Sequence, residues 1–231
     1  WKDVGYVRAF GDLLDARNAV FGNVSNTTRG IFAPWVCYKE DIMDIGLHDE
    51  SFHSYHEDSD IFNRFILNNY KIIQSWEAYV YHLTCRGGQF QDGVEQVTQD
   101  PLFHEMKNKA MRNYVRKWGM FIKNDEYQYP VIIPKYNVAF IVKHCNSELL
   151  ELLEPWCDTI YTDVPYDQYI NIEQKNTKFD LRKKLKRYED QKTNNVIIEF
   201  DANRLTNESF EFFNMLQLVL EDSGQIGESE F

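Results

Sequence analysis

The segment His56-Glu57-Asp58-Ser59-Asp60 holds the densest group of side chains that could do chemistry. Its carboxylates stand where the sequence pattern predicts the start of a helix, and a helix N-terminus favours negative charge. A carboxylate there can act as a general base if its surroundings raise its pKa, and its oxygens also suit a divalent cation. The alternative interpretation is that Asp58 and Asp60 only cap the helix.

Histidines beside this segment raise a second hypothesis, a metal site. His48, His53 and His56 fall in one loop, with spacings of five and three residues. These spacings do not place the three side chains on one helix face. The neighbouring carboxylates therefore favour a chemistry that does not depend on a histidine cluster.

Four stretches must position these groups. Apolar residues recur with the period of an amphipathic helix over 58–70. Residues 30–46 predict a short apolar strand that leads into a helix, and 71–83 hold two short β-type runs. Residues 102–118 predict a second helix, with a basic face. We expect the acidic segment to lie at the start of the 58–70 helix.

The order and spacing of motifs between about residues 30 and 90 resemble the acceptor-side half of family 2 glycosyltransferases, which have the GT-A fold. No single motif is specific, but the set follows the family's order. The matching pieces are Gly46-Leu47-His48-Asp49-Glu50, Glu57-Asp58-Ser59-Asp60, Arg64, Asn69-Tyr70-Lys71-Ile72, and Tyr81-His82 with Gly87-Gly88 after it.

This resemblance implies transfer of a sugar from a nucleotide-sugar donor to the hydroxyl of a glycan or other acceptor, with inversion. It assigns catalysis to Asp58, as the base that takes the acceptor proton, with Glu57 beside it. Large aromatic side chains can stack on sugar faces, although they also serve as core residues. The residues expected at the acceptor are Asp60, Trp35, Trp76 and Arg64.

After Pro130, predicted strands and helices alternate, which is typical of a parallel sheet covered by helices. The strands are predicted at 137–142, 158–164 and 195–202, and the helices at 147–156, 178–191 and 207–224. The predicted fold class is therefore α/β: the C-terminal part of a GT-A (Rossmann-like) glycosyltransferase domain, residues 1–128, followed by a small α/β domain, residues 129–231.

The small domain carries a weaker resemblance, to the nucleotide-binding half of the GT-A fold. It implies that Asp163 faces the nucleotide base and that Asp201 and Asn203 stand at the metal motif. Asp201 is then a candidate ligand of a divalent metal, Mn or Mg, if the donor site is present. The first resemblance adds His82, because the late His of the family can lie near the metal and the diphosphate. Three explanations stay open: a degenerate second transferase-like domain, a rearranged order of halves, or an unrelated accessory α/β domain, which we favour.

The resemblance departs from the family at the start of the chain. In the family a nucleotide-binding half precedes the segment that matches here, whereas this sequence starts at Trp1. We therefore expect an N-terminally truncated fragment that lacks the usual donor site. The alternative function is a non-catalytic transferase-like module that binds a glycan or a partner protein.

Composition excludes other classes of protein. The chain has 36 acidic and 25 basic residues and a net charge of -11, so we expect no nucleic-acid partner. No apolar stretch of about 18 residues is free of charge, so we expect no transmembrane segment. The four cysteines lack the two-residue spacing of a zinc or redox pair, which predicts reduced thiols and a cytoplasmic location.

Overall fold

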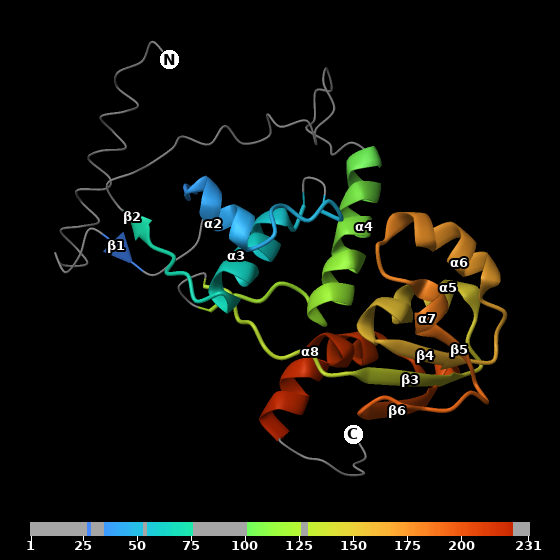
Figure 1. The fold of residues 1–231 in the computed structure, drawn as a ribbon. Coiled ribbons are helices and arrows are strands. Elements are labelled where there is room, and N and C mark those ends of the chain that lie inside the picture. The colour runs from blue at the N-terminus through green and yellow to red at the C-terminus, as the bar shows by residue number, and fades with distance from the viewer. Residues whose placement is uncertain (1–26, 29–34, 53–54, 76–100, 126–128, 224–231) are drawn as a thin grey trace, which may run out of the picture.

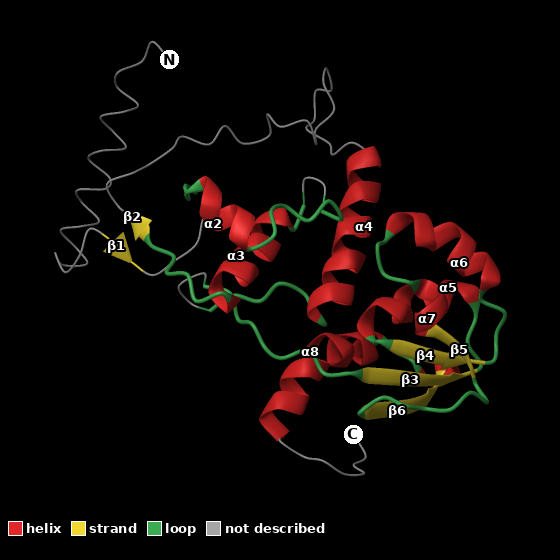
Figure 2. Cartoon of the chain, viewed as in Figure 1, coloured by secondary structure: helices red, strands yellow, loops and turns green. Residues whose placement is uncertain are grey.

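The structure is a computed structural model that describes residues 27–28, 35–52, 55–75, 101–125 and 129–223 (Figure 1). Helices α2, α3 and α4 precede a sheet unit that contains four strands and further helices (Figure 2). The predictions for Trp76 and His82 fall outside the described residues.

The first part is built around α3 (Glu57–Leu67), which confirms the predicted helix there. Ile61 and Phe65 are buried on one face of α3 and pack with Ile45, which follows α2 (Lys39–Asp44). A short antiparallel pair joins β1 (Thr27–Thr28) and β2 (Gln74–Ser75). The apolar period of the sequence therefore decides which face of α3 is buried.

The second part contains a four-stranded sheet in the order β5-β4-β3-β6, with every neighbouring pair parallel. This confirms the predicted α/β class and the parallel sheet. The strands are β3 (Val138–Lys143), β4 (Thr159–Thr162), β5 (Leu185–Arg187) and β6 (Val196–Asp201).

One face of the sheet carries the main core of the molecule. Val138, Phe140 and Val142 alternate along β3 and pack with side chains from the helices that follow. Their neighbours Ala139 and Ile141 face the other way. The helices are α5 (Ser147–Leu153), η1 (Glu154–Trp156), α6 (Asp167–Glu173), η2 (Gln174–Asn176), α7 (Leu181–Lys184), η3 (Ala202–Arg204) and α8 (Asn207–Ser223).

The predicted helix over 178–191 is wrong. Asp180 caps α7 by accepting from the Arg182 N–H, but α7 ends after one turn at Lys184. Leu185 then begins β5 and pairs with Ile160 of β4. Leucines four residues apart fit a helix equally well, and only the open edge of β4 selects the strand.

Helix α4 (Pro101–Trp118) lies between α3 and the sheet unit (Figure 1). The predicted division assigns α4 to residues 1–128, yet its Val115 is buried in the core of the sheet unit. The other long helix, α8, carries charged residues near both of its ends, Glu208 and Glu211 at the start and Glu221 and Asp222 at the end. Among the described residues, no helix has the length and apolar character needed to cross a membrane.

Candidate functional site

Asp58 lies in the first turn of α3, where the indole of Trp35 holds it. Trp35 Nε1 donates a hydrogen bond of 3.0 Å to Asp58 Oδ1. The Trp35 ring also packs edge-on against Phe62 and Phe65, with ring centroids 6.1 and 6.3 Å apart. Because an indole N–H only donates, this contact orients the carboxylate and leaves Oδ2 as the oxygen that a further donor could reach.

Asp60, two residues later, is completely buried. Its Oδ1 accepts from Trp118 Nε1 at 3.0 Å and lies 2.6 Å from Lys117 Nζ. Its Oδ2 accepts from Arg64 Nε at 2.9 Å. These contacts join α3 to the C-terminal end of α4. The Asp60 carboxylate thus contacts protein groups, and its role in acceptor binding stays a prediction.

Arg64 connects α3 to the segment before it. Its Nη1 donates to the carbonyl oxygen of Ile45 at 2.6 Å, just after α2. With the bond to Asp60, this contact fixes α2, α3 and α4 relative to one another. The side chain of Arg64 is 14% exposed, so in this arrangement it serves packing, and acceptor binding by Arg64 also stays a prediction.

His56, the N-cap residue of α3, has a left-handed backbone with φ of 70° and makes no capping bond. Its ring lies 4.3 Å from the Tyr55 ring and 5.1 Å from the Tyr114 ring, centroid to centroid. Burial, with a contribution from the charge of Lys107, lowers the pKa of His56 to about 4, so the ring is neutral at pH 7. Among the described residues, neither buried ring nitrogen has a hydrogen-bond partner.

Within the described part of the chain, the Glu57 Oε2 atom and the Arg64 Nη2 atom are also buried and without a hydrogen-bond partner. Buried polar atoms without partners are costly and gather, with strained backbones, at functional sites. His56 is therefore a candidate that the sequence offered only as part of a histidine loop. Its left-handed conformation has no signal in the sequence.

Sequence analysis also missed Lys117 and Trp118, the two residues of α4 that contact Asp60. The sequence places Lys117 on the basic face of the 102–118 helix and gives no sign of a partner. Trp118 lies 58 residues from Asp60 along the chain. Only the packing of α4 against α3 brings these side chains together.

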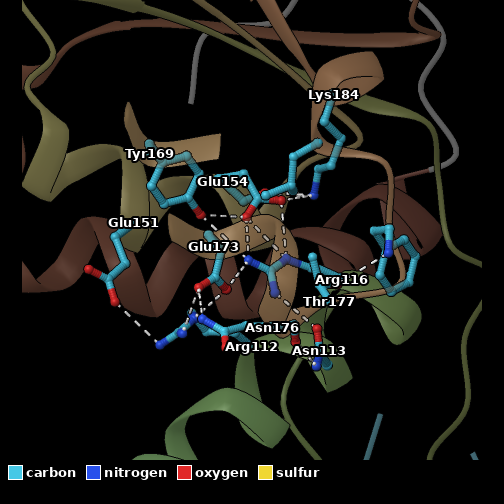
Figure 3. Close-up of polar contacts among 12 residues, drawn as sticks. Arg112, Asn113, Arg116, Glu151, Glu154, Tyr169, Glu173, Asn176, Thr177 and Lys184 are labelled. Atoms are coloured by element: carbon cyan, nitrogen blue, oxygen red, sulfur yellow. Dashed lines mark hydrogen bonds and ion pairs between the residues drawn. The ribbon is translucent and has the colours of Figure 1, made fainter. Parts of the chain in front are cut away.

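A second polar cluster lies on the opposite side of α4, buried against the sheet unit (Figure 3). Arg116 is 0% exposed and donates from Nη2 to Glu154 Oε2 at 2.6 Å and to Glu173 Oε1 at 2.7 Å. Lys184 Nζ lies 2.5 Å from Glu154 Oε1. Two buried cations therefore face two buried carboxylates.

The charges in this cluster stabilise one another. Burial raises the pKa of Glu154, but the charges of Lys184 and Arg116 outweigh it and hold the pKa at about 2. Burial and the Glu154 carboxylate raise the pKa of Tyr169, whose hydroxyl donates to Glu154 Oε2 at 2.8 Å. The cluster has internal partners for its charges, so its arrangement serves structure and not ligand binding.

The predicted metal ligand Asp201 ends β6, at the carboxyl edge of the sheet. Its Oδ1 accepts from the Asn203 N–H at 2.9 Å and lies 3.1 Å from His144 Nδ1. The Asn203 hydrogen bond and the His144 contact lower the pKa of Asp201. Asp163 follows β4 at the same edge.

These residues do not by themselves fit a bound divalent cation. Within the described ranges, no group of three or more His, Cys, Asp or Glu side chains could hold a metal ion. Asp201 offers one carboxylate, and Mg²⁺ sites with so few protein ligands depend on phosphates of the substrate. The assignment of Asp201 as a metal ligand therefore stays a prediction.

Asp58 lies on α3, beyond the amino edge of the sheet, whereas Asp201 ends β6 at the carboxyl edge. Before β3, Lys135 Nζ donates to the carbonyl oxygen of Arg116 at 2.7 Å, so the amino edge of the sheet faces α4. Asp201 pairs in register with Lys143, the last of the six residues of β3. A strand of that length spans about 20 Å, and α4 lies between α3 and the strands of the sheet unit (Figure 1). We therefore describe Asp58 and Asp201 as two separate candidate sites.

No protein-family model, curated protein or solved structure matched this chain in three comparisons with known proteins. The glycosyltransferase assignment is therefore a proposal.

Proposed function

We propose that the chain forms the acceptor side of an inverting glycosyltransferase with a GT-A-like fold, in which Asp58 is the general base. The observation that carries the proposal is the hydrogen bond from Trp35 to Asp58. The family resemblance assigns Asp58 the role of the base, and Trp35 is a candidate at the acceptor because its ring could stack on a sugar. The two residues lie 23 positions apart in the sequence. Their contact at the start of α3 supports the proposal, because it brings two residues expected at the acceptor together and orients one oxygen of the carboxylate.

In this proposal, Asp58 Oδ2 accepts the proton of the acceptor hydroxyl. The hydroxyl oxygen attacks the anomeric carbon of the donor sugar from the side opposite the phosphate. The bond from that carbon to the phosphate oxygen breaks, and its electron pair leaves with the nucleoside diphosphate. Trp35 occupies Oδ1 and so turns Oδ2 toward the acceptor, while Asp60 keeps α3 in place.

The sheet unit supports a GT-A-like fold only in its topology. The order β5-β4-β3-β6 corresponds to 3-2-1-4, the first four positions in the classic order of a doubly wound nucleotide-binding sheet. Its carboxyl edge, with Asp163, Asp201 and Asn203, is the place where such a sheet binds a nucleotide. Because this edge lies away from Asp58, a donor sugar for Asp58 has to be held by groups other than Asp163, Asp201 and Asn203.

The same separation favours one second candidate function. A transferase-like module without a donor beside Asp58 could bind a glycan or a partner protein without turnover. In that case ligand binding would be indifferent to nucleoside diphosphates and to Mn²⁺. The two functions differ in one observable, the acceptor-dependent release of nucleoside diphosphate.

The test uses the full chain with UDP-glucose, UDP-N-acetylglucosamine or GDP-mannose, each with p-nitrophenyl glycosides as acceptors, with and without Mn²⁺. We expect acceptor-dependent release of UDP or GDP, and a loss of at least about 100-fold in Asp58→Asn. Asp167→Asn, at the exposed start of α6, is the matched control and should keep full activity. Glycoside binding without release from any donor would support the binding module instead.

A further inference from the structure

We infer that Arg116 is a positioning residue for the Asp58 site, and that the sheet unit holds this site in shape through α4. That Asp58 is a catalytic base rests on the proposed function. The mechanical coupling does not, because it joins the contacts of Arg116 with Glu154 and Glu173 to the contacts of Lys117 and Trp118 with Asp60. It gives the sheet unit a role that does not depend on a bound nucleotide.

Helix α4 makes polar contacts on two sides, one toward the sheet unit and the other toward α3. Toward the sheet unit, Arg112 and Arg116 both bind Glu173, at 3.0 and 2.7 Å. Toward α3, the Tyr114 hydroxyl accepts from Asn63 Nδ2 at 2.9 Å, one turn before the pair that binds Asp60. Residues 112 and 116 share one side of a helix by their spacing of four, and 114 and 118 share another.

The sheet side of α4 is fixed firmly. Arg116 donates to Glu154 from two of its nitrogens and to Glu173 from Nη2. Its carbonyl oxygen also accepts from Lys135 Nζ. Removing one partner from a buried ion pair is strongly destabilising, because the other charge is left buried without compensation. The position and rotation of α4 at residue 116 are therefore set by the sheet unit.

The position of α4 determines the position of α3 through the two residues that follow Arg116. Lys117 and Trp118 follow Arg116 without interruption, and both contact Asp60. A shift or rotation of α4 that releases Arg116 must also move these two donors. Asp60 is buried and lies in the same helical turn as Asp58, so a displaced Asp60 carries the proposed base with it.

The segment after α4 leaves little room for compensation. Gly119 has φ of 81°, and a Cβ placed on it would lie 2.9 Å from Gln217 Cγ of α8. Gln217 Oε1 in turn accepts from the Tyr136 N–H at 2.8 Å, just before β3. Close packing of this kind transmits a displacement instead of absorbing it.

The test compares Arg116→Lys with Arg112→Lys in the full chain. Lysine keeps the charge, but one ammonium group cannot span Glu154 and Glu173 as the guanidinium does. Arg112 lies one turn earlier on α4, is 20% exposed and also binds Glu173, so it is the matched control. The readouts are the indole ¹H–¹⁵N resonances of Trp35 and Trp118 and the hydrogen exchange of the α3 amides.

We expect Arg116→Lys to shift both indole resonances and to raise exchange in 57–67 about tenfold, while Arg112→Lys changes neither. A folded Arg116→Lys protein with wild-type indole resonances and wild-type exchange in α3 would overturn the inference. If Arg116→Lys does not fold, Glu173→Gln, which keeps Glu154 in place, replaces it under the same criteria.

These readouts need no turnover, so the inference and the proposed function can fail separately. If the wild-type chain shows no transfer but Arg116→Lys still disturbs α3, the coupling holds and the enzyme proposal fails. If transfer is present, Arg116→Lys should lower kcat and leave the KM for the acceptor within about twofold. A change in KM alone would contradict a role in placing the base.

Discussion

Trp118 and Asp60 are 58 residues apart in the chain and are joined by a hydrogen bond of 3.0 Å from indole Nε1 to carboxylate Oδ1. The bond crosses from the last residue of α4 to the first turn of α3. Asp60 is buried, so water cannot replace the indole. The position of the candidate base Asp58 therefore depends on a helix that contributes no atom to the proposed reaction.

The first prediction concerns the charge of Asp60. Asp60→Asn keeps the shape of the side chain but leaves Lys117 and Arg64 facing a neutral amide in a buried place. We expect the free energy of unfolding to fall by about 3 kcal/mol. Trp118→Phe removes one hydrogen bond and should cost about 1 kcal/mol. Urea denaturation measures both, and equal losses in the two variants would contradict the role given to the charge.

The second prediction is a pH dependence that arises from His56. Because the folded-state pKa is lowered to about 4 from 6.5, the unfolded chain binds a proton between these values that the folded chain does not. Stability should therefore fall as the pH drops from 6.5 to 4, and this contribution is fully present above pH 6.5. Glu154, whose pKa is lowered from 4.5 to about 2, loses its contribution only as the pH falls below about 4.5, so it overlaps this window only at the acidic end.

The variant that isolates this effect is His56→Asn, since asparagine tolerates the left-handed backbone at this position. Urea denaturation at several pH values should show a shallower slope between pH 4 and 6.5 in the variant. Between pH 7 and 8 the two slopes should agree. An unchanged slope in the acidic window would mean that the buried imidazole is not what titrates there.

The third prediction compares two glycines with positive φ. Gly119→Ala places a methyl group 2.9 Å from Gln217 Cγ, on a side chain that is only 1% exposed and bonded to Tyr136. Gly46→Ala imposes similar backbone strain at φ of 92°, but its nearest neighbour is Arg64 Nη1 at 3.9 Å. We expect a loss of about 1–2 kcal/mol for Gly46→Ala.

Gly119→Ala should cost more than Gly46→Ala, because Gln217 must also move from its hydrogen bond. Thermal unfolding followed by circular dichroism would rank the two variants. Equal melting temperatures would show that the Gln217 side chain moves away freely. The packing of Gly119 against Gln217 would then restrict the segment after α4 less than the short distance indicates.

The sequence predicted the elements that local patterns define. The strands that became β3, β4 and β6 are short apolar runs between polar turns, and α3 has a clear period of 3.6. The apolar pattern gave the wrong element after Lys184. A continuous helix and a helix followed by a strand would each bury both Leu181 and Leu185. The strand assignment depends on pairing with Ile160, and Lys184 adds a buried contact with Glu154, 30 residues away.

The same limit applies to the candidate site. Asp58 could be found because acids before an apolar period indicate a helix start. The partners of Asp60 could not, since nothing in the sequence around residues 116–118 refers to α3. The conformation of His56 could not be found either, because a left-handed residue other than glycine is imposed by tertiary packing.

The last prediction concerns the indole of Trp35. Trp35→Phe keeps an aromatic ring against Phe62 and Phe65 but removes the hydrogen bond to Asp58 Oδ1. Under the proposed function, the free carboxylate can rotate away from the acceptor, so kcat should fall about tenfold or more with a small change in KM. Stability should drop by only about 1 kcal/mol.

The control for this variant is Trp156→Phe, a buried tryptophan of the sheet unit whose ring lies 4.9 Å from that of Phe121. It also shortens an aromatic side chain, but it has no contact with Asp58 among the described residues. Stability should fall through lost packing while kcat for transfer stays within about twofold of wild type. If both variants lowered kcat in proportion to stability, the orienting role of the Trp35 indole would be wrong.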